Sequence, residues 1–176
     1  MSLQIFILGM LCEDYHHPYD IKKMFKRIKL EEVLKISDGT LYYNFDVLLK
    51  KQYIEKIEII RDEHRPDKTT YGITDKGREA LQQEIYNSFK RFTDIKSLYA
   101  PLTFLKHADK DKISFLLEES IEKLRKKINK NHDGWNSLLQ KPQETVQFIY
   151  EHALNRMELD AQWLEKLLTW IRSSST

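Results

Sequence analysis

The stretch SDGTLYYNF, residues 37–45, gathers hydroxyl and amide side chains at the expected start of a helix. Ser37 is a residue type that caps helices, and Thr40, Tyr43 and Asn44 fall off the apolar stripe that follows. Free backbone N–H groups at a helix start attract anions, and hydroxyl and amide groups can hydrogen-bond phosphates and base edges. This chemistry indicates a surface that contacts phosphates and bases.

Two residues in the same stretch allow more than one interpretation. Gly39 would let the backbone approach a phosphate closely, or it would allow tight packing against the preceding helix. The ring of Tyr42 can pack under a neighbouring hairpin while its hydroxyl touches a phosphate.

Four basic residues are the best candidates for further phosphate contacts. Lys50 and Lys51 follow the apolar stripe of the helix, and Arg65 and Lys68 flank the tip of the next expected hairpin. Each phosphate that they neutralise would add about one unit to the salt dependence of binding. Acidic residues in the same tip would repel phosphates. Partial contact of the hairpin with DNA is therefore the alternative to full contact.

The elements around this stretch define an order. Apolar spacing and the helix-capping and helix-breaking residues predict three helices, over residues 3–12, from Pro18 onward and from Ser37 to about 52. A strand over 54–60, a charged loop over 61–67 and a strand over 68–74 follow, and then a helix from Thr74 to about Tyr99. Three helices followed by a hairpin form the plan of a winged helix-turn-helix, whose third helix enters the DNA major groove. The expected fold class is therefore mainly α with a small β-hairpin.

The remainder of the chain predicts two long helices, at roughly 110–131 and 142–171, joined by a link that contains glycine. Their apolar stripe is too broad for a two-helix hairpin to cover, which favours burial against a second subunit. Packing against the first domain of the same chain is the alternative. We expect a winged helix-turn-helix domain over 1–99 and a helical dimerisation domain over 100–176. The expected dimer contacts are Leu3, Phe6, Ile149, Leu154, Met157, Leu164, Leu168 and Ile171.

Composition and motifs disfavour other classes of protein. The chain of 176 residues is 41% hydrophobic and 32% charged with a net charge of +2, which is typical of a soluble globular protein. Its longest apolar run, Ile5–Leu11, is far short of a membrane span. The single cysteine, Cys12, fits a reducing cytoplasm. No nucleophile motif, phosphate-binding glycine loop or metal-ligand spacing occurs, so we expect no enzyme, metal or cofactor.

Several motifs together resemble the PadR family of bacterial transcriptional regulators. They are ILGML at 7–11, HPYDIKKMF at 17–25, SDGTLYYNFDVLLKKQYIE at 37–55, TTYGITDKGREAL at 69–81 and RMELDAQWLEKLLTWI at 156–171. The resemblance implies a homodimer that binds operator double-stranded DNA, acts as a repressor, and responds to small aromatic or lipophilic effectors. Family members commonly carry basic residues in the middle of the recognition helix, where this chain has Asp46 and Val47.

Two further expectations follow from the resemblance. Trp135 and Trp163 could line an aromatic effector pocket, although packing in the core or in an interface would also explain tryptophans there. The rival function is a winged helix that binds another protein and no DNA, which the near-neutral first half of the chain and Asp46 favour.

Overall fold

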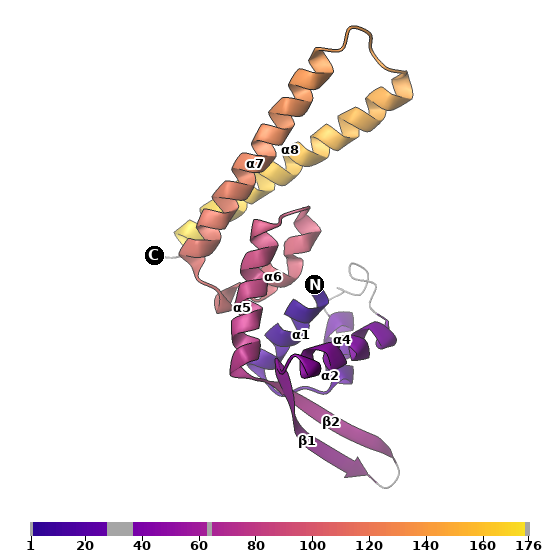
Figure 1. The fold of residues 1–176 in the computed structure, drawn as a ribbon, viewed down its shortest axis with the longest axis vertical. Helices are drawn as coiled ribbons and strands as arrows, with labels where there is room; N and C mark the ends of the chain where they lie inside the picture. The colour runs from indigo at the N-terminus through magenta and orange to yellow at the C-terminus, as the bar shows by residue number, and fades with distance from the viewer. Residues whose placement is uncertain (1, 28–36, 63–64, 175–176) are drawn as a thin grey trace. The chain divides into compact units, whose positions relative to one another are not determined.

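The computed structural model describes residues 2–27, 37–62 and 65–174 (Figure 1). The chain divides into two compact units. The first unit comprises Met1–Ile85 and Tyr99–His107, and the second comprises Tyr86–Leu98 and Ala108–Thr176. The expected boundary between residues 99 and 100 therefore lies in a region where the chain passes from one unit to the other and back.

Helix α1 (Ser2–Glu13) is the centre of the first unit. Ile5, Phe6, Ile7 and Leu8 are each at most 1% exposed, because α4, β2 and α6 surround the helix. The ring of Phe6 meets Phe104 edge-on at 5.1 Å, and a Cβ on Gly9 would stand 2.3 Å from that second ring. Glycine is thus required where α1 and the segment after α6 (Tyr99–Thr103) cross closely.

Helices α2 (Pro18–Arg27) and α4 (Asp38–Lys50) complete the three-helix part of this unit. The Oγ of Ser37 accepts a hydrogen bond from the Thr40 amide, as predicted for a capping serine, and α4 buries Leu41, Phe45 and Leu48. Gln52 has a φ of 62° and ends the helix, with the amides of Gln52 and Tyr53 donating to Leu49 and Leu48 carbonyls. Glycine is the usual residue at such a C-terminal cap.

Strands β1 (Ile54–Asp62) and β2 (Arg65–Ile73) pair antiparallel, from Ile54 opposite Ile73 to Asp62 opposite Arg65. The expected charged loop over 61–67 was wrong at residues 61, 62 and 65–67, which belong to the two strands. His16 adds an isolated bridge to Tyr71, with paired backbone hydrogen bonds of 3.1 and 3.0 Å. The observed order of helices and hairpin is that of a winged helix-turn-helix, and it confirms the predicted fold class.

Helix α5 (Asp75–Lys90) ends nine residues earlier than the predicted Tyr99. The Asp94 carboxylate accepts a hydrogen bond from the Ser97 amide and starts a separate short helical turn, η1 (Ile95–Leu98). Pro101 lies buried in the first turn of α6, where a missing N–H costs no hydrogen bond, and η2 (Leu105–His107) follows.

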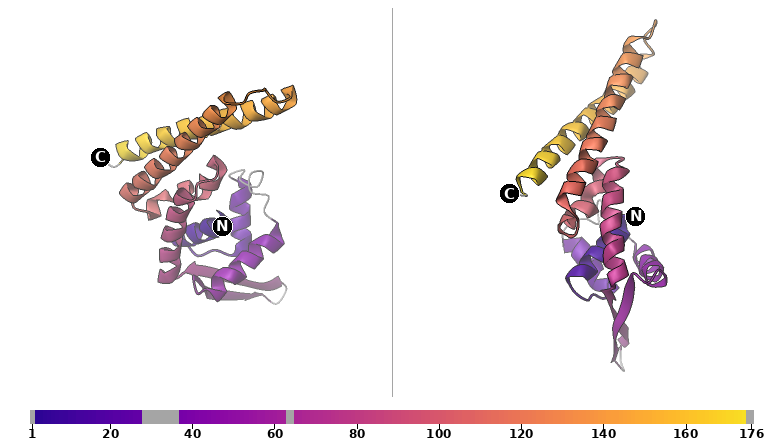
Figure 2. Two further views of the ribbon diagram at one scale, coloured as in Figure 1. Left: turned by 45° about the horizontal axis from the view of Figure 1, so that its top comes forward. Right: turned by 60° about the vertical axis from the view of Figure 1, so that its left-hand side comes forward.

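The second unit is built on a hairpin of two long helices, α7 (Lys110–Asn136) and α8 (Glu144–Ser173), which lie side by side (Figure 2). Ile128, Leu154 and Ala161 form a core cluster between them. Helix α7 runs five residues beyond the predicted end at 131 and includes Gly134. The ring of Trp135 stacks on Tyr150 of α8 at 3.9 Å, and this contact supports the extra helical turn.

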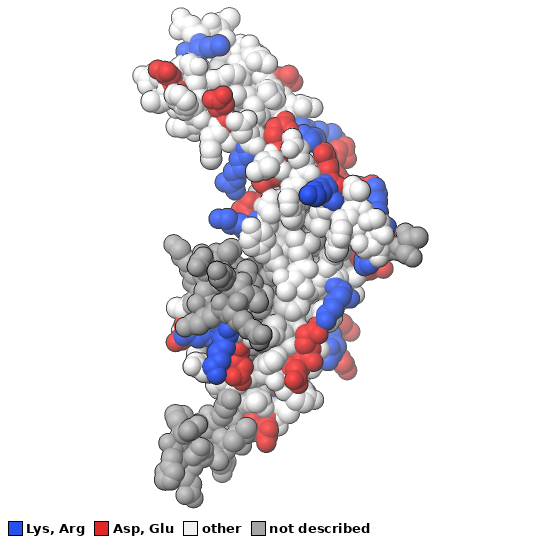
Figure 3. Space-filling view, turned by 180° about the vertical axis from the view of Figure 1, so that it is seen from behind, with Lys and Arg blue, Asp and Glu red and all other residues white. Residues whose placement is uncertain are grey.

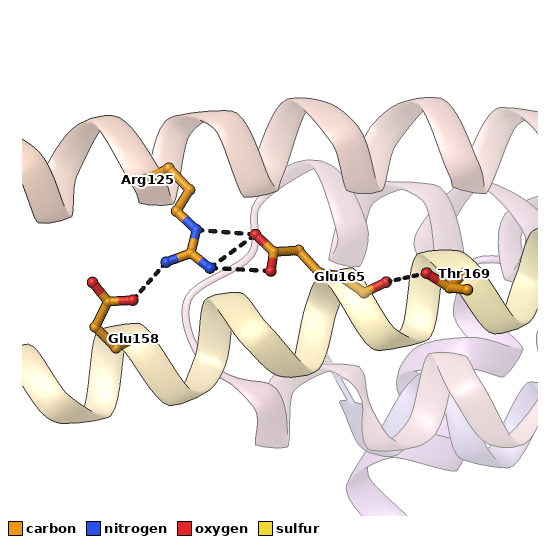
Figure 4. Close-up of polar contacts among 4 residues, drawn as sticks. All are labelled: Arg125, Glu158, Glu165 and Thr169. Atoms are coloured by element: carbon orange, nitrogen blue, oxygen red, sulfur yellow. Dashed lines mark hydrogen bonds and ion pairs between the residues drawn. The ribbon is translucent and has the colours of Figure 1, made fainter.

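One arginine links the two long helices (Figure 4). The guanidinium of Arg125 on α7 binds both carboxylate oxygens of Glu165 at 3.0 Å and reaches Glu158 at 2.5 Å. Hydrogen bonds to Glu165, and then to Glu158, raise the pKa of Arg125. A forked contact to two glutamates that lie two turns apart on α8 fixes how α7 and α8 align along their length.

Candidate nucleic-acid interface

Helix α4 presents one line of residues directly away from its core. Gly39, Tyr43, Asp46 and Lys50 follow at spacings of four, three and four, which places them on one face of the helix. This face is opposite the buried Leu41, Phe45 and Leu48, and every member is exposed. We refer to Gly39, Tyr43, Asp46 and Lys50 as the outward line of α4.

Gly39 has no packing role among the residues that the structure describes. No described atom lies within 4 Å of the place where a Cβ would stand. Gly77 is the opposite case, because its Cβ would stand 1.9 Å from the Tyr53 carbonyl oxygen. Tight packing against the described part of α2 therefore does not explain Gly39, and close approach by a phosphate stays a prediction.

The hydroxyl groups at the start of α4 already form some hydrogen bonds within the chain. Ser37 Oγ lies 2.8 Å from Thr40 Oγ1 and also accepts the Thr40 amide at 3.2 Å. Both residues are exposed, so each hydroxyl retains a side towards solvent. Asp38 beside them forms an ion pair with Lys22 of α2, a pairing between distant residues that the local pattern could not reveal.

Asn44 differs from the expectation. Its side-chain oxygen accepts a hydrogen bond from Gln4 Nε2 of α1 at 3.0 Å, and its amide nitrogen donates to the Thr40 carbonyl at 2.7 Å. Because both ends of the amide are engaged within the chain, Asn44 holds α1 against α4 and is a poor candidate for contacting a base.

Tyr42 and the hairpin meet at one edge of α4. Tyr71 of β2 packs against Phe45 with ring centroids 5.0 Å apart. Burial raises the pKa of Tyr71, and the nearby Asp46 and Tyr42 raise it further. Tyr42 is 47% exposed and lies close enough to Tyr71 to affect its pKa, and packing of the Tyr42 ring under the hairpin stays a prediction.

The expected basic residues are not all gathered at one place. Lys50 lies on the outward line, but roughly 18 Å along the helix from Asp38 at 1.5 Å per residue. Lys51 Nζ lies 5.7 Å from the Tyr53 ring centroid and lines a cavity of about 500 Å³ together with Gln4 and Leu8 of α1. Lys51 thus points towards α1, away from the outward line.

The hairpin carries the other two basic candidates. Arg65 pairs with Asp62 and Lys68 with Ile60, so both lie in the half of β2 nearest the turn. On the face drawn in Figure 3, Lys and Arg side chains are interspersed with Asp and Glu rather than gathered in one patch.

A second uncovered surface lies on α8. Residues 149, 152, 156, 159, 163, 166 and 170 alternate in steps of three and four, which defines one helix face, and we call it the outer face of α8. Ile149, Leu159 and Trp170 on this face are 68%, 65% and 55% exposed. Leu159 and Trp170 were not among the expected dimer contacts, although their spacing from Ile149 places them on the same face.

The expected dimer contacts divide by burial. Phe6, Leu154, Leu164 and Ile171 are covered by the chain itself, because they pack in the cores of the two units, so they offer little surface to a partner. Leu3, Met157 and Leu168 are partly exposed, and Ile149 is the most exposed of the set.

The two tryptophans expected at an effector pocket lie apart. Trp135 and Tyr150 form a wall of a cavity of about 500 Å³, which Lys127 and Lys130 also line. Trp163 is thirteen residues beyond Tyr150 on α8, or roughly 20 Å along the helix. The structure therefore does not bring Trp135 and Trp163 into one pocket.

The surroundings of Cys12, the single cysteine of the chain, do not favour its thiolate. Burial raises the pKa of the Cys12 thiol, although Arg78, whose guanidinium donates to the sulfur at 3.5 Å, acts against this. A thiol with a raised pKa is a weak nucleophile at neutral pH. Within residues 2–27, 37–62 and 65–174, no cluster of three potential metal ligands occurs and no helix is long and apolar enough to span a membrane.

The first unit is a winged helix-turn-helix domain with an exposed third helix. Residues 7–83 match the model of the transcriptional regulator PadR-like family. This amino-terminal part of the chain is therefore similar to PadR-like transcriptional regulators.

Solved structures give matches of similar kind. Bacillus subtilis PadR in complex with operator DNA is 20% identical, with 97% of this chain and 99% of that chain covered and a TM-score of 0.45. The protein smu.1604c from Streptococcus mutans UA159 is 22% identical, with coverage of 94% and 98% and a TM-score of 0.44. Bacillus subtilis PadR in complex with p-coumaric acid is 20% identical, with coverage of 98% and 99% and a TM-score of 0.40. A comparison with curated protein sequences found no match.

Proposed function

We propose that this chain is a sequence-specific DNA-binding transcriptional repressor of the cytoplasm. Each subunit would place α4 in the major groove with its leading end towards the bases. The observation that carries the proposal is Gly39, an exposed glycine in the first turn of α4 with open space around it. Beside it Tyr43 is 66% exposed, which suits contact with a phosphate or base.

The contacts that support binding form two groups. Backbone groups at Gly39 and the hydroxyls of Ser37, Thr40 and Tyr43 would bind at the start of α4. Tyr42, Lys50, Arg65 and Lys68 would contact the DNA backbone at the edges, and Lys51 is the weakest candidate because it turns towards α1.

We further propose that the repressor is a homodimer joined through the outer face of α8. Exposed Ile149, Leu159 and Trp170 would be covered by the same face of a second copy, with Met157 and Leu168 at its margin. Leu3 on α1 is partly exposed and stays a predicted dimer contact. A two-fold arrangement presents identical faces to one another, and it would set two half-sites about 34 Å apart on the DNA. The operator would accordingly be palindromic.

Release of the operator by a small aromatic or lipophilic effector is part of the proposal. The cavity beside Trp135 and Tyr150 offers an aromatic wall of the kind that such a molecule would stack against. Thermal-shift screening with phenolic acids and hydrophobic cations, followed by operator release, tests this. Operator binding that no stabilising compound weakens would leave DNA binding intact and refute effector control.

Selection of bound sequences from a random DNA pool tests the function itself. We expect a palindromic consensus whose binding weakens steeply with salt. A purified dimer that selects no sequence and shifts no DNA at low salt would instead support the rival function, a winged helix that binds protein.

A further inference from the structure

We propose that Asp46 reads sequence by accepting a hydrogen bond from the exocyclic amino group of a cytosine in the major groove. The inference rests on the proposed DNA binding and goes beyond it, because it names a base and the residue that selects it. Asp46 lies on the outward line of α4, one turn after Tyr43, so a helix that enters the groove by this line brings its carboxylate to the bases.

The surroundings of Asp46 leave its carboxylate available. Among the residues that the structure describes, it forms no hydrogen bond and no ion pair, although Lys50 stands four residues on at a spacing that permits a pair. The other carboxylate of α4, Asp38, is paired with Lys22. Asp46 lies close enough to Tyr71 of β2 to raise the pKa of that tyrosine, and a neutral tyrosine cannot neutralise a carboxylate.

A mid-helix aspartate is also unfavourable for the helix itself. Aspartate has low helix propensity, and the stabilising interaction of an acidic residue with the helix dipole is confined to the first turn. Asp46 is the ninth of the thirteen residues of α4. Neither helix formation nor an observed contact within the chain explains a carboxylate at this position.

The chemistry of the major groove selects the base. An ionised carboxylate only accepts hydrogen bonds, and the donors at the groove edge are the amino groups of cytosine and adenine. Adenine places its N7 acceptor beside the amino group and would repel the second carboxylate oxygen, whereas cytosine carries no such acceptor on its own edge. Guanine and thymine present acceptors at this position and would be rejected.

The same charge carries a cost that predicts the direction of a substitution. A carboxylate near the phosphates weakens binding to every sequence, and only a matching cytosine offsets the loss. Asp46→Asn keeps the size of the side chain, removes the charge and adds a donor. This variant should bind non-matching DNA more tightly than the parent protein and should discriminate less between bases.

The test is selection from a random DNA pool with the full chain, its Asp46→Asn variant and Asp38→Asn. The Asp38 variant is the matched control, because it removes the same charge from the same helix at a residue paired with Lys22. We expect one cytosine in each half-site of the parent consensus to lose its preference in Asp46→Asn and to persist in Asp38→Asn. Circular dichroism and thermal unfolding establish that both variants are folded.

Binding to two defined operators gives the magnitude. Replacing that C·G pair by T·A should weaken the parent protein about 5- to 150-fold, the discrimination that one good base contact supplies. In Asp46→Asn the ratio of the affinities for the C·G and T·A operators should fall close to one. An unchanged consensus and ratio in Asp46→Asn would overturn the role of Asp46 while leaving DNA binding in place. Failure of the parent protein to select any sequence would overturn the proposed function and this inference together.

Discussion

The outward line of α4 and the outer face of α8 are both uncovered, and their chemistry differs. Each belongs to an amphipathic helix whose opposite side is buried, by Leu41, Phe45 and Leu48 in α4 and by a core cluster that includes Leu154 and Ala161 in α8. On α4 the exposed residues are a glycine, a tyrosine, an aspartate and a lysine. On α8 they include isoleucine, leucine and tryptophan at more than half exposure.

This difference indicates what each face requires. A polar face is stable in water without a partner. Side chains on it can therefore serve to recognise a partner, and replacing them should leave the fold intact. Large apolar side chains that are exposed on one helix face favour a partner that removes them from water, which is the property of a subunit interface. Substitutions on α4 should therefore separate binding from stability, and substitutions on α8 should change assembly.

The largest change in the free energy of unfolding is expected for a substitution on the buried side of α4. Substitutions on the two exposed faces are compared with it. Leu48 is 0% exposed, and Leu48→Ala should lower the free energy of unfolding by about 2–5 kcal/mol. Urea denaturation measures this change. Val47→Ala, at a half-buried position next to it, should cost clearly less, and equal losses would show that the burial pattern of α4 is not the one described.

The outer face of α8 should respond in its state of assembly. The double variant Leu159→Ala/Trp170→Ala should raise the dimer dissociation constant by roughly 30-fold or more, because large apolar side chains dominate such interfaces. Sedimentation equilibrium measures the constant. Phe115→Ala on α7 removes a ring of similar exposure, 59%, and should leave the constant unchanged. A dimer unaffected by the double variant would place the interface elsewhere.

Sequence patterns predicted the parts of the fold that depend on neighbouring residues. The cap at Ser37, the buried stripe of α4 and the order of helices and hairpin required only local spacing, and the structure confirms them. The end of α5 was wrong because the side chain of Asp94 starts a new turn. The end of α7 was wrong because Trp135 stacks on Tyr150 of another helix, a contact that no local periodicity records.

In the candidate site, too, the features that depend on local spacing were predictable, and those that depend on distant residues were not. The exposure of Tyr43 follows from its spacing relative to Leu41 and Leu48. The loss of Asn44 as a base contact follows from Gln4, forty residues away in the sequence, and became visible only when α1 and α4 were placed together. The spacing of Asp46 was visible from the start, but only the fold shows that it has no ion-pair partner among the described residues.

Tyr43 provides the test of the polar face. Tyr43→Ala should weaken operator binding by about 10-fold through loss of a contact to a charged phosphate, and it should change the free energy of unfolding by less than about 0.5 kcal/mol. Fluorescence anisotropy and urea denaturation measure the two quantities. Tyr43→Phe removes the hydroxyl and keeps the ring, and it should lose most of the operator affinity that Tyr43→Ala loses. Unchanged operator affinity in Tyr43→Ala would remove this residue from the interface.

The smallest effect, at Gly39, makes the sharpest distinction between a residue kept for the fold and one kept for a partner. Gly39→Ala adds a Cβ into open space at a helical position, so it should raise the free energy of unfolding by about 0.4–1 kcal/mol. Gly77→Ala, whose Cβ would overlap the Tyr53 carbonyl, should lower it. If the α4 backbone approaches a phosphate at Gly39, the more stable Gly39→Ala protein should bind its operator less tightly. A variant that is more stable and binds equally well would mean that the space at Gly39 stays empty in the complex.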